Sequence, residues 1–209
     1  YRISIPFTKS SAPDATTTPL LAFTVPPYQA DGITENYILE RFNAATQEYV
    51  RLNNNSTLRR GEGYRLKPIN SGTSIKRPAE DPANVVPTAV TSFTITLRRD
   101  TSQDVPNTDP NNGFNLIGFP FNPSLYSSVQ WSNNTEVTVS FVAPDGRTAN
   151  SVDEAVSKGL LVGPGNLLRY DPFSNTYVPA SALEPYQGYF VQTVVDGLKM
   201  TLHVASSTP

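Results

Sequence analysis

The sequence predicts an all-β fold: duplicated antiparallel units, each sandwich- or barrel-like, with one short helix in the second copy. Apolar and polar residues alternate with a period of two in short segments rich in β-branched and aromatic residues, for example at Leu198, Met200 and Leu202. Glycine, proline and Asx residues separate these segments. Two long stretches of the chain also match each other, and one segment has helical spacing.

The same alternation sets the bounds of the expected strands. In the first half they cover 2–7, 20–25, 37–42, 48–52, 63–69 and 73–76. In the second half they cover 92–99, 114–119, 136–143, 166–170, 176–179, 188–195 and 198–204. Asn43 and Asp171 each open a tight connection between two strands, because an Asx side chain can bond to the backbone of its own turn.

An internal duplication relates the two halves. Arg41, Phe42, Tyr49 and Val50 match Arg169, Tyr170, Tyr177 and Val178 at a constant spacing of 128 residues. Leu58, Gly63, Tyr64 and Leu66 match Leu183, Gly188, Tyr189 and Val191 at a spacing of 125 residues. Weaker matches join 23–28 to 116–121 and 3–5 to 95–97. In each copy two aromatic residues lie on either side of a turn, so we expect a cross-strand aromatic pair in both hairpins.

The duplication divides the chain into three parts. A first β-repeat covers 1–75, a proline-rich linker covers 76–90, and a second β-repeat covers 91–209. The linker reads KRPAEDPANVVPTAV, and its three prolines predict an extended connection. The second repeat contains an inserted hairpin and helix between residues 127 and 164.

The inserted helix is expected to begin after Asn150 or Ser151, either of which can cap it. Ser151 and Glu154 have the spacing of a capping box, in which the serine hydroxyl accepts a backbone hydrogen bond at the helix start. Val152 and Ala155 share one face, and Gly159 can end the helix. We expect this helix to cover an open end of the β-structure.

Composition excludes several classes of function. The 209 residues include no cysteine and one histidine, so disulfides, thiolate chemistry and most catalytic triads are excluded. The net charge of −2 gives no overall field that would attract nucleic acid, so we expect no nucleic-acid partner. No apolar run reaches the length of a bilayer span, so we expect a chain that is not membrane-spanning. The chain begins at Tyr1 without a methionine, as a processed mature protein or an excised fragment would, and we expect an exported protein whose signal peptide has been removed.

Three segments of the second repeat carry a resemblance to a known module. They begin at Gly113 (GFNLIGFPF), at Leu168 (LRYD, closed by Tyr177) and at Leu183 (LEPYQGYFV). Their order resembles the repeated all-β "GWNLIGxP…YD…Y…LxPGxGYWV" modules of bacterial secreted and cell-surface proteins. The resemblance implies an exported, extracellular, non-catalytic module, often beside adhesion or polysaccharide-binding domains. This chain has Phe114 where the module usually has tryptophan, and Tyr186 where it usually has glycine.

Aromatic residues near loops are the candidate ligand-binding residues. Tyr126, Trp131 and Tyr186 can offer ring faces to a sugar, although buried loop anchors are the alternative interpretation. His203 lies on the polar side of the last strand, and we expect it to face solvent.

Oxygen-bearing side chains give a candidate metal site. Asp104, Asn107, Asp109 and Asn111 offer ligands of the kind that calcium prefers. The segment lacks the order of an EF-hand loop and its closing glutamate, so a polar inter-strand loop is the favoured interpretation. Calcium is the one cofactor that the sequence leaves open.

These features predict a non-enzymatic structural or interaction module of the bacterial cell surface, which self-associates or docks onto a larger complex. The first 90 residues carry a net charge of +2 and the rest −4, which favours association of unlike surfaces. One alternative is a carbohydrate-binding module with a polysaccharide partner. A second is a glycoside hydrolase-like enzyme that uses a carboxylate pair such as Asp171 with Glu184, or Asp153 with Glu154.

Overall fold

The computed structural model describes residues 2–4, 17–19, 36–69, 90–101, 112–121, 125–132, 138–163 and 167–204. Over these residues the fold is all-β with a single short helix, as the sequence predicts. The first repeat contains β1 (Arg2–Ser4), β2 (Thr17–Pro19), β3 (Tyr37–Asn43), β4 (Glu48–Arg51), β5 (Thr57–Arg59) and β6 (Gly63–Pro68). The rest contains β7 (Ser92–Leu97), β8 (Phe114–Gly118), β9 (Val129–Gln130), β10 (Val139–Val142), β11 (Thr148–Ala149), α1 (Val152–Ser157), β12 (Leu167–Asp171), β13 (Thr176–Pro179), β14 (Ala182–Leu183), β15 (Gly188–Gln192) and β16 (Leu198–His203).

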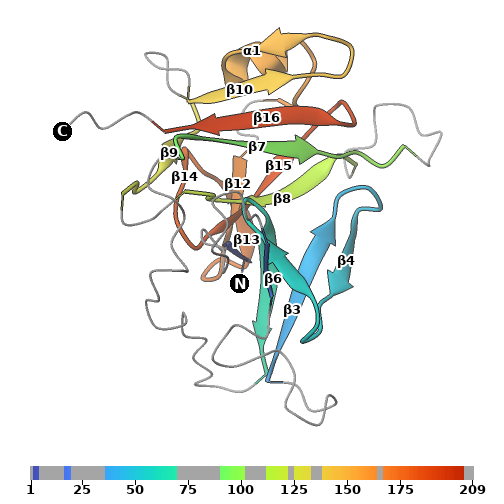
Figure 1. The fold of residues 1–209 in the computed structure, drawn as a ribbon, viewed down its shortest axis with the longest axis vertical. Coiled ribbons are helices and arrows are strands. Elements are labelled where there is room, and N and C mark those ends of the chain that lie inside the picture. The colour runs from blue at the N-terminus through green and yellow to red at the C-terminus, as the bar shows by residue number, and fades with distance from the viewer. Residues whose placement is uncertain are drawn as a thin grey trace.

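Three four-stranded antiparallel sheets form the body of the molecule. The first-repeat sheet has the order β1-β6-β3-β4, and the second-repeat sheet has the order β13-β12-β15-β8. A third, added sheet has the order β11-β10-β16-β7. Figure 1 shows the added sheet and α1 at one end, β3, β4 and β6 at the other, and β8, β12 and β15 between them. The second-repeat sheet is therefore the central layer.

The two repeat sheets have the same strand order and the same register. Phe42 lies opposite Tyr49 in the β3–β4 hairpin, as Tyr170 lies opposite Tyr177 in the β12–β13 hairpin. Arg41 lies opposite Tyr64 on β6, as Arg169 lies opposite Tyr189 on β15. The spacings of 128 and 125 residues therefore relate equivalent positions of two sheets.

The equivalent tyrosines Tyr64 and Tyr189 make the same hydrogen bond. The backbone N–H of Arg59 donates to the Tyr64 hydroxyl over 2.6 Å, and that of Glu184 donates to the Tyr189 hydroxyl over 2.9 Å. Both tyrosine rings are buried. Each phenol thus anchors the turn that precedes its own strand, and burial raises the pKa of both hydroxyls.

The structure corrects the weaker upstream match of the two repeats. β1 pairs with β6 through Ser4 and Gly63, and β8 pairs with β15 through Gly118 and Gly188. The counterpart of β8 is therefore β1, whereas 95–97 lie in β7 of the added sheet and do not correspond to 3–5. The segment 23–28, matched to 116–121, lies outside the described residues, as do the predicted strands 20–25 and 73–76 and the linker from 76 to 89.

Short paired strands complete each repeat. β2 pairs with β5, and β9 pairs with β14, with Leu58 and Leu183 at equivalent buried positions. The sequence did not predict these strands as separate elements. Because β9 belongs to the repeat, the insertion consists of the β10–β11 hairpin and α1, which is a shorter stretch than 127–164.

Helix α1 begins as predicted. The Ser151 side chain caps it by accepting from the Glu154 backbone N–H, and the Glu154 carboxylate reaches back to the Asn150 N–H. Val152 and Ala155 are buried, and Gly159 follows the helix with a positive φ of 65°. None of the helices described is long and apolar enough to cross a membrane.

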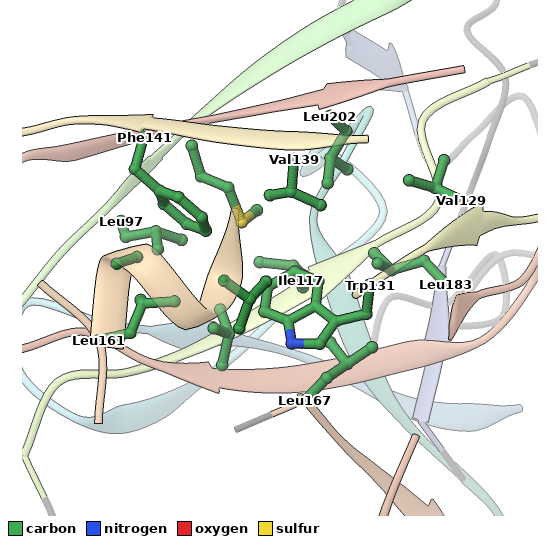
Figure 2. Packing of buried hydrophobic residues seen from close by; sticks show 14 of the residues in the cluster. Leu97, Ile117, Val129, Trp131, Val139, Phe141, Leu161, Leu167, Leu183 and Leu202 are labelled. Atoms are coloured by element: carbon green, nitrogen blue, oxygen red, sulfur yellow. The ribbon is translucent and has the colours of Figure 1, made fainter. Parts of the chain in front are cut away.

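A large apolar core lies between the second-repeat sheet and the added sheet. Leu97, Ile117, Phe141, Val191 and Met200 are each no more than 1% exposed and come from the strands of both sheets. Figure 2 shows the residues of this cluster converging beneath the strands and α1. The first repeat buries a further set of side chains: Tyr37, Leu39, Leu52, Leu58 and Tyr64.

One equivalent turn position has a left-handed backbone in both repeats. Gly61 has a φ of 82°, and Tyr186, its counterpart at a spacing of 125 residues, has a φ of 65°. Glycine adopts this conformation at little cost, whereas other residues are disfavoured there by about 1 kcal/mol. A Cβ added at Gly61 would also lie 2.6 Å from Cε1 of Phe93. Tyr186 lies where the module that the sequence resembles usually has glycine, so this residue adopts the left-handed conformation at a free-energy cost.

We predict opposite effects of exchanging the residue types at these two positions. Gly61→Ala should lower the free energy of unfolding by more than about 1 kcal/mol, and Tyr186→Gly should raise it by a few tenths of a kcal/mol, because glycine's larger unfolded-state entropy offsets part of the gain. Urea denaturation of the two variants and the wild type measures both changes. Gly61→Ala with unchanged stability would contradict the assignment of strain to this turn.

Candidate functional site

The two repeats meet along β8, the edge strand of the second-repeat sheet. The Gln47 side chain binds the backbone of Phe114 twice: its Nε2 donates to the Phe114 carbonyl over 3.1 Å, and its Oε1 accepts from the Phe114 N–H over 3.0 Å. The Gly118 N–H donates to the Gly61 carbonyl over 2.9 Å. Two turns of the first repeat thus cover the exposed edge of β8, which gives unpaired strand groups their hydrogen-bond partners.

Aromatic rings fill the space between the two repeat sheets. The ring of Phe190 on β15 has its centroid 5.3 Å from that of Phe42, 5.7 Å from that of Phe114 and 5.4 Å from that of Tyr177. All three contacts are edge-to-face, the arrangement that aromatic quadrupoles favour. Phe190 therefore contacts aromatic residues of both repeats.

The predicted cross-strand aromatic pairs are confirmed in both hairpins. The Phe42 and Tyr49 rings are 5.2 Å apart, and the Tyr170 and Tyr177 rings are 5.7 Å apart, each pair with an interplanar angle of 64°. Each pair stabilises its own hairpin by up to about 1 kcal/mol. Because one ring of each pair also contacts Phe190, the hairpins and the inter-repeat contact are joined in one aromatic cluster.

These rings leave an open groove between the repeats, which we call the aromatic groove. Its cavity volume is about 310 Å³. It is lined by Phe42, Gln47, Tyr49, Phe114, Leu168, Tyr177 and Phe190. Tyr177 is 42% exposed at its rim, while Phe190 is 8% exposed at its floor. The lining is almost wholly apolar, so the groove suits an apolar or aromatic group.

The first-repeat side of the groove is basic. Arg65 lies over the Tyr49 ring, with its guanidinium carbon 3.6 Å from the ring centroid, and forms an ion pair with Glu40. The hydrogen bond from Arg65 holds the pKa of the Glu40 carboxyl below its usual range, and the charges of Lys67 and Arg51 act in the same direction. The equivalent cross-strand pair in the second repeat is Leu168 with Phe190.

A fully exposed aromatic ring stands at the tip of the β12–β13 hairpin. Phe173 is 98% exposed. Its backbone N–H donates to Asp171 Oδ1 over 3.1 Å, and the Ser174 hydroxyl donates to Asp171 Oδ2 over 2.7 Å. Asn175, with a φ of 54°, completes the turn. The turn is held by its own hydrogen bonds, so the ring is presented on an ordered support.

The residues predicted to stack on sugar do not form an exposed platform. Trp131 is 5% exposed, and Figure 2 shows its indole turned inward among Ile117 and Leu167. Tyr126 is half-buried, with its ring 5.9 Å from that of Phe121. Tyr186 is 44% exposed in its turn. Burial of the only tryptophan removes the central ring of the predicted platform, because a core ring has no face free for a ligand.

The predicted calcium residues Asp104, Asn107, Asp109 and Asn111 lie outside the described residues. In the described ranges, no group of three or more histidine, aspartate or glutamate side chains could hold a metal ion. His203 is half-buried rather than fully solvent-facing, with Nε2 3.1 Å from the Ser140 hydroxyl.

Two of the carboxylates considered for hydrolysis, Asp171 and Glu154, have structural partners. Asp171 organises its turn, and Glu154 bonds to Asn150 N–H and to Lys158. Both interactions lower the pKa of these exposed carboxyls. Neither is a protonated acid of the kind that glycoside hydrolysis requires.

Sequence reasoning predicted the aromatic pairs that include Phe42, Tyr49 and Tyr177, but missed the groove that these residues line and the exposed tip at Phe173. Phe173 was visible as an aromatic residue inside a polar turn, DPFSNT, which is the one available signal. Gln47, Phe114 and Phe190 come together only through the packing of the two repeats, which no local pattern describes. Comparison of the chain with family models, curated proteins and solved structures finds no match.

The depressed pKa of Glu40 predicts a pH-dependent contribution to stability. A carboxyl whose pKa is lower in the folded than in the unfolded chain stabilises the fold above the unfolded value, near 4.5, and loses that effect as pH falls through the folded value. Glu40→Gln should therefore be less stable than the wild type at pH 7, and the difference should shrink on acidification. Urea denaturation at pH 7 and at lower pH tests this.

The matched control removes the cation. In an Arg65→Leu background, Glu40→Gln should show a much weaker pH-dependent difference, because Arg65 is the main cause of the shift. A Glu40→Gln effect that is the same at every pH would contradict the interaction assigned to this pair.

Proposed function

We propose that the chain is a non-enzymatic interaction module that self-associates, with Phe173 of one copy entering the aromatic groove of a second copy. The observation that carries this proposal is that one chain presents both a fully exposed aromatic ring and an open aromatic groove. Self-association requires such complementary surfaces on one molecule.

The exposed ring is suited to act as an anchor. Burying a phenylalanine side chain contributes about 1.5–3 kcal/mol, and Phe173, at 98% exposure, has this contribution still available. The hydrogen bonds of Asp171 fix the turn, so little conformational entropy is lost when the ring enters a pocket. Aromatic residues of this kind dominate the energetics of many interfaces.

The groove offers a matching site in size, chemistry and charge. Its volume of about 310 Å³ accommodates a phenyl ring, and Phe42, Tyr49 and Tyr177 present ring edges and faces to it. Arg65 and Arg51 lie on the first-repeat side near Glu40, whereas the tip carries Asp171, which is charged at neutral pH. These opposite charges favour the docking of the tip on the groove.

A reciprocal contact about a two-fold axis suits the placement of these features. Phe173 and the rim residue Tyr177 belong to the same hairpin, and β13 is an edge strand of its sheet. Antiparallel approach of two β13 edges places the tip of each hairpin beside the base of the other, where Leu168 lies opposite Pro179 and lines the groove. Each copy then both donates and receives a ring.

The location of the protein is also a proposal. Export to the cell surface rests on the resemblance described above. The carbohydrate-binding alternative loses the stacking ring of Trp131, and the hydrolase alternative uses carboxylates that have structural partners. We therefore favour a protein–protein contact at the aromatic groove over both.

We predict that Phe173→Ala abolishes or strongly weakens self-association without affecting the fold. Sedimentation velocity over a concentration series should show the wild type passing from monomer to dimer, with the dissociation constant raised at least about tenfold in the variant. Urea denaturation should show little change in stability, because the ring makes almost no contact within the monomer.

Val142→Ala is the matched control. Val142 is 46% exposed on β10 of the added sheet, away from the groove, so its truncation should leave association unchanged. A wild type that stays monomeric at all concentrations, or a Phe173→Ala variant that associates like the wild type, would overturn the proposal.

A further inference from the structure

A second hollow lies between the repeats and differs in chemistry from the aromatic groove. We call it the arginine cleft, and its volume is about 470 Å³. Arg41 comes from β3, Arg59 from β5, and Arg98 follows β7, so both repeat regions contribute cations to it. Glu62 is the carboxylate among its lining residues. The cleft therefore carries an excess of positive charge.

The three arginines differ in how far their charge is neutralised. Arg98 pairs with Asp196 over 3.0 Å, and Arg59 pairs with Glu62 over 3.5 Å while its side chain is 56% exposed. Among the described residues no ion pair is recorded for Arg41, which is half-buried beside Tyr64. An arginine held in a cleft without a carboxylate partner is available to bind an anionic ligand.

The wall of the cleft is ordered before any ligand arrives. The Tyr64 hydroxyl accepts from the Arg59 N–H and donates to Glu62 Oε2 over 3.0 Å. The Tyr64 ring itself is fully buried, so it holds both Arg59 and Glu62 in place.

The equivalent position in the second repeat lacks the excess charge. A smaller cleft of about 200 Å³ is lined there by Arg169, Glu184 and Tyr189, the counterparts of Arg41, Arg59 and Tyr64. Glu184 stands where the first repeat has Arg59, so one cation faces one carboxylate. The second repeat thus supplies an internal comparison, because its equivalent cleft carries no excess of positive charge.

We propose that the arginine cleft binds the carboxylate of a uronic acid residue in an acidic saccharide. Arginine presents two parallel N–H donors that match a carboxylate, and 470 Å³ accommodates a sugar ring with its neighbours. Glu62 selects against a polyacidic peptide, because a second closely spaced carboxylate would meet its charge. A sugar hydroxyl can instead donate to Glu62. Phe42 lines both hollows, but none of the three arginines lines the aromatic groove, so their substitution tests this site separately from self-association.

Isothermal titration calorimetry with digalactosyl-galacturonate, a trisaccharide that carries a single carboxylate, tests this proposal. The wild type should bind saturably, and more weakly as salt rises, because the contact is between charges. Arg41→Gln and Arg59→Gln should each weaken binding by about tenfold or more, as expected for the loss of a hydrogen bond between charged groups. The Arg59 side chain is largely exposed, so that variant keeps the fold even if Arg41→Gln does not.

The control variants make the result specific. Arg169→Gln changes the equivalent arginine of the second repeat and should leave binding unchanged, and so should Phe173→Ala. Glu62→Gln should keep binding of the single-carboxylate trisaccharide and permit binding of a pentaglutamate peptide. Absence of saturable binding, equal binding of pentaglutamate or of neutral galactotriose by the wild type, or an equal loss in Arg169→Gln would overturn the proposal.

Discussion

The contact of the Phe190 ring with Phe42 of the first repeat and with Phe114 and Tyr177 of the second holds the two repeats together. It exists because the duplicated unit differs at one cross-strand pair. Where the first repeat has the ion pair of Glu40 and Arg65, the second has Leu168 and Phe190. The apolar pair gives the second sheet a face that the aromatic residues of the first can cover, while the charged pair of the first sheet lies beside the Tyr49 ring.

The equivalent hairpin turns of the two repeats also differ. One contacts the rest of the monomer, and the other carries a ring that faces solvent. In the first repeat Gln47 turns inward and binds the edge of β8. Its counterpart in the second repeat, Asn175, instead accepts a hydrogen bond from the Tyr170 hydroxyl, and the neighbouring Phe173 stays in solvent. One hairpin therefore completes the monomer, and the other is left to contact something else. The two clefts described above also differ in charge, because Arg59 and Glu184 occupy equivalent positions.

The sequence predicts those parts of the structure that depend on local chemistry. The two long hairpins, the aromatic pairs across them and the Ser151 cap follow from alternation, Asx turns and capping spacing. The strands of two or three residues, such as β5 and β14, are too short to show a period. Burial of Trp131 and the assembly of the aromatic groove depend on contacts between distant segments. Residue type alone does not show whether an aromatic ring near a loop packs into the core or is exposed to a ligand. Here Trp131 is buried and Phe173 is exposed.

A double-mutant cycle on Phe42 and Phe190 tests the inter-repeat contact most directly. Both residues are changed to alanine, singly and together, and the free energy of unfolding is measured by urea denaturation. The structure predicts a coupling energy of about 0.5–1.5 kcal/mol, because the two rings touch edge to face across the repeats. The distant pair Phe42 and Phe141, on β3 and β10, should show additive effects. Additivity within about 0.3 kcal/mol for Phe42 and Phe190 would contradict the claim that this contact joins the repeats.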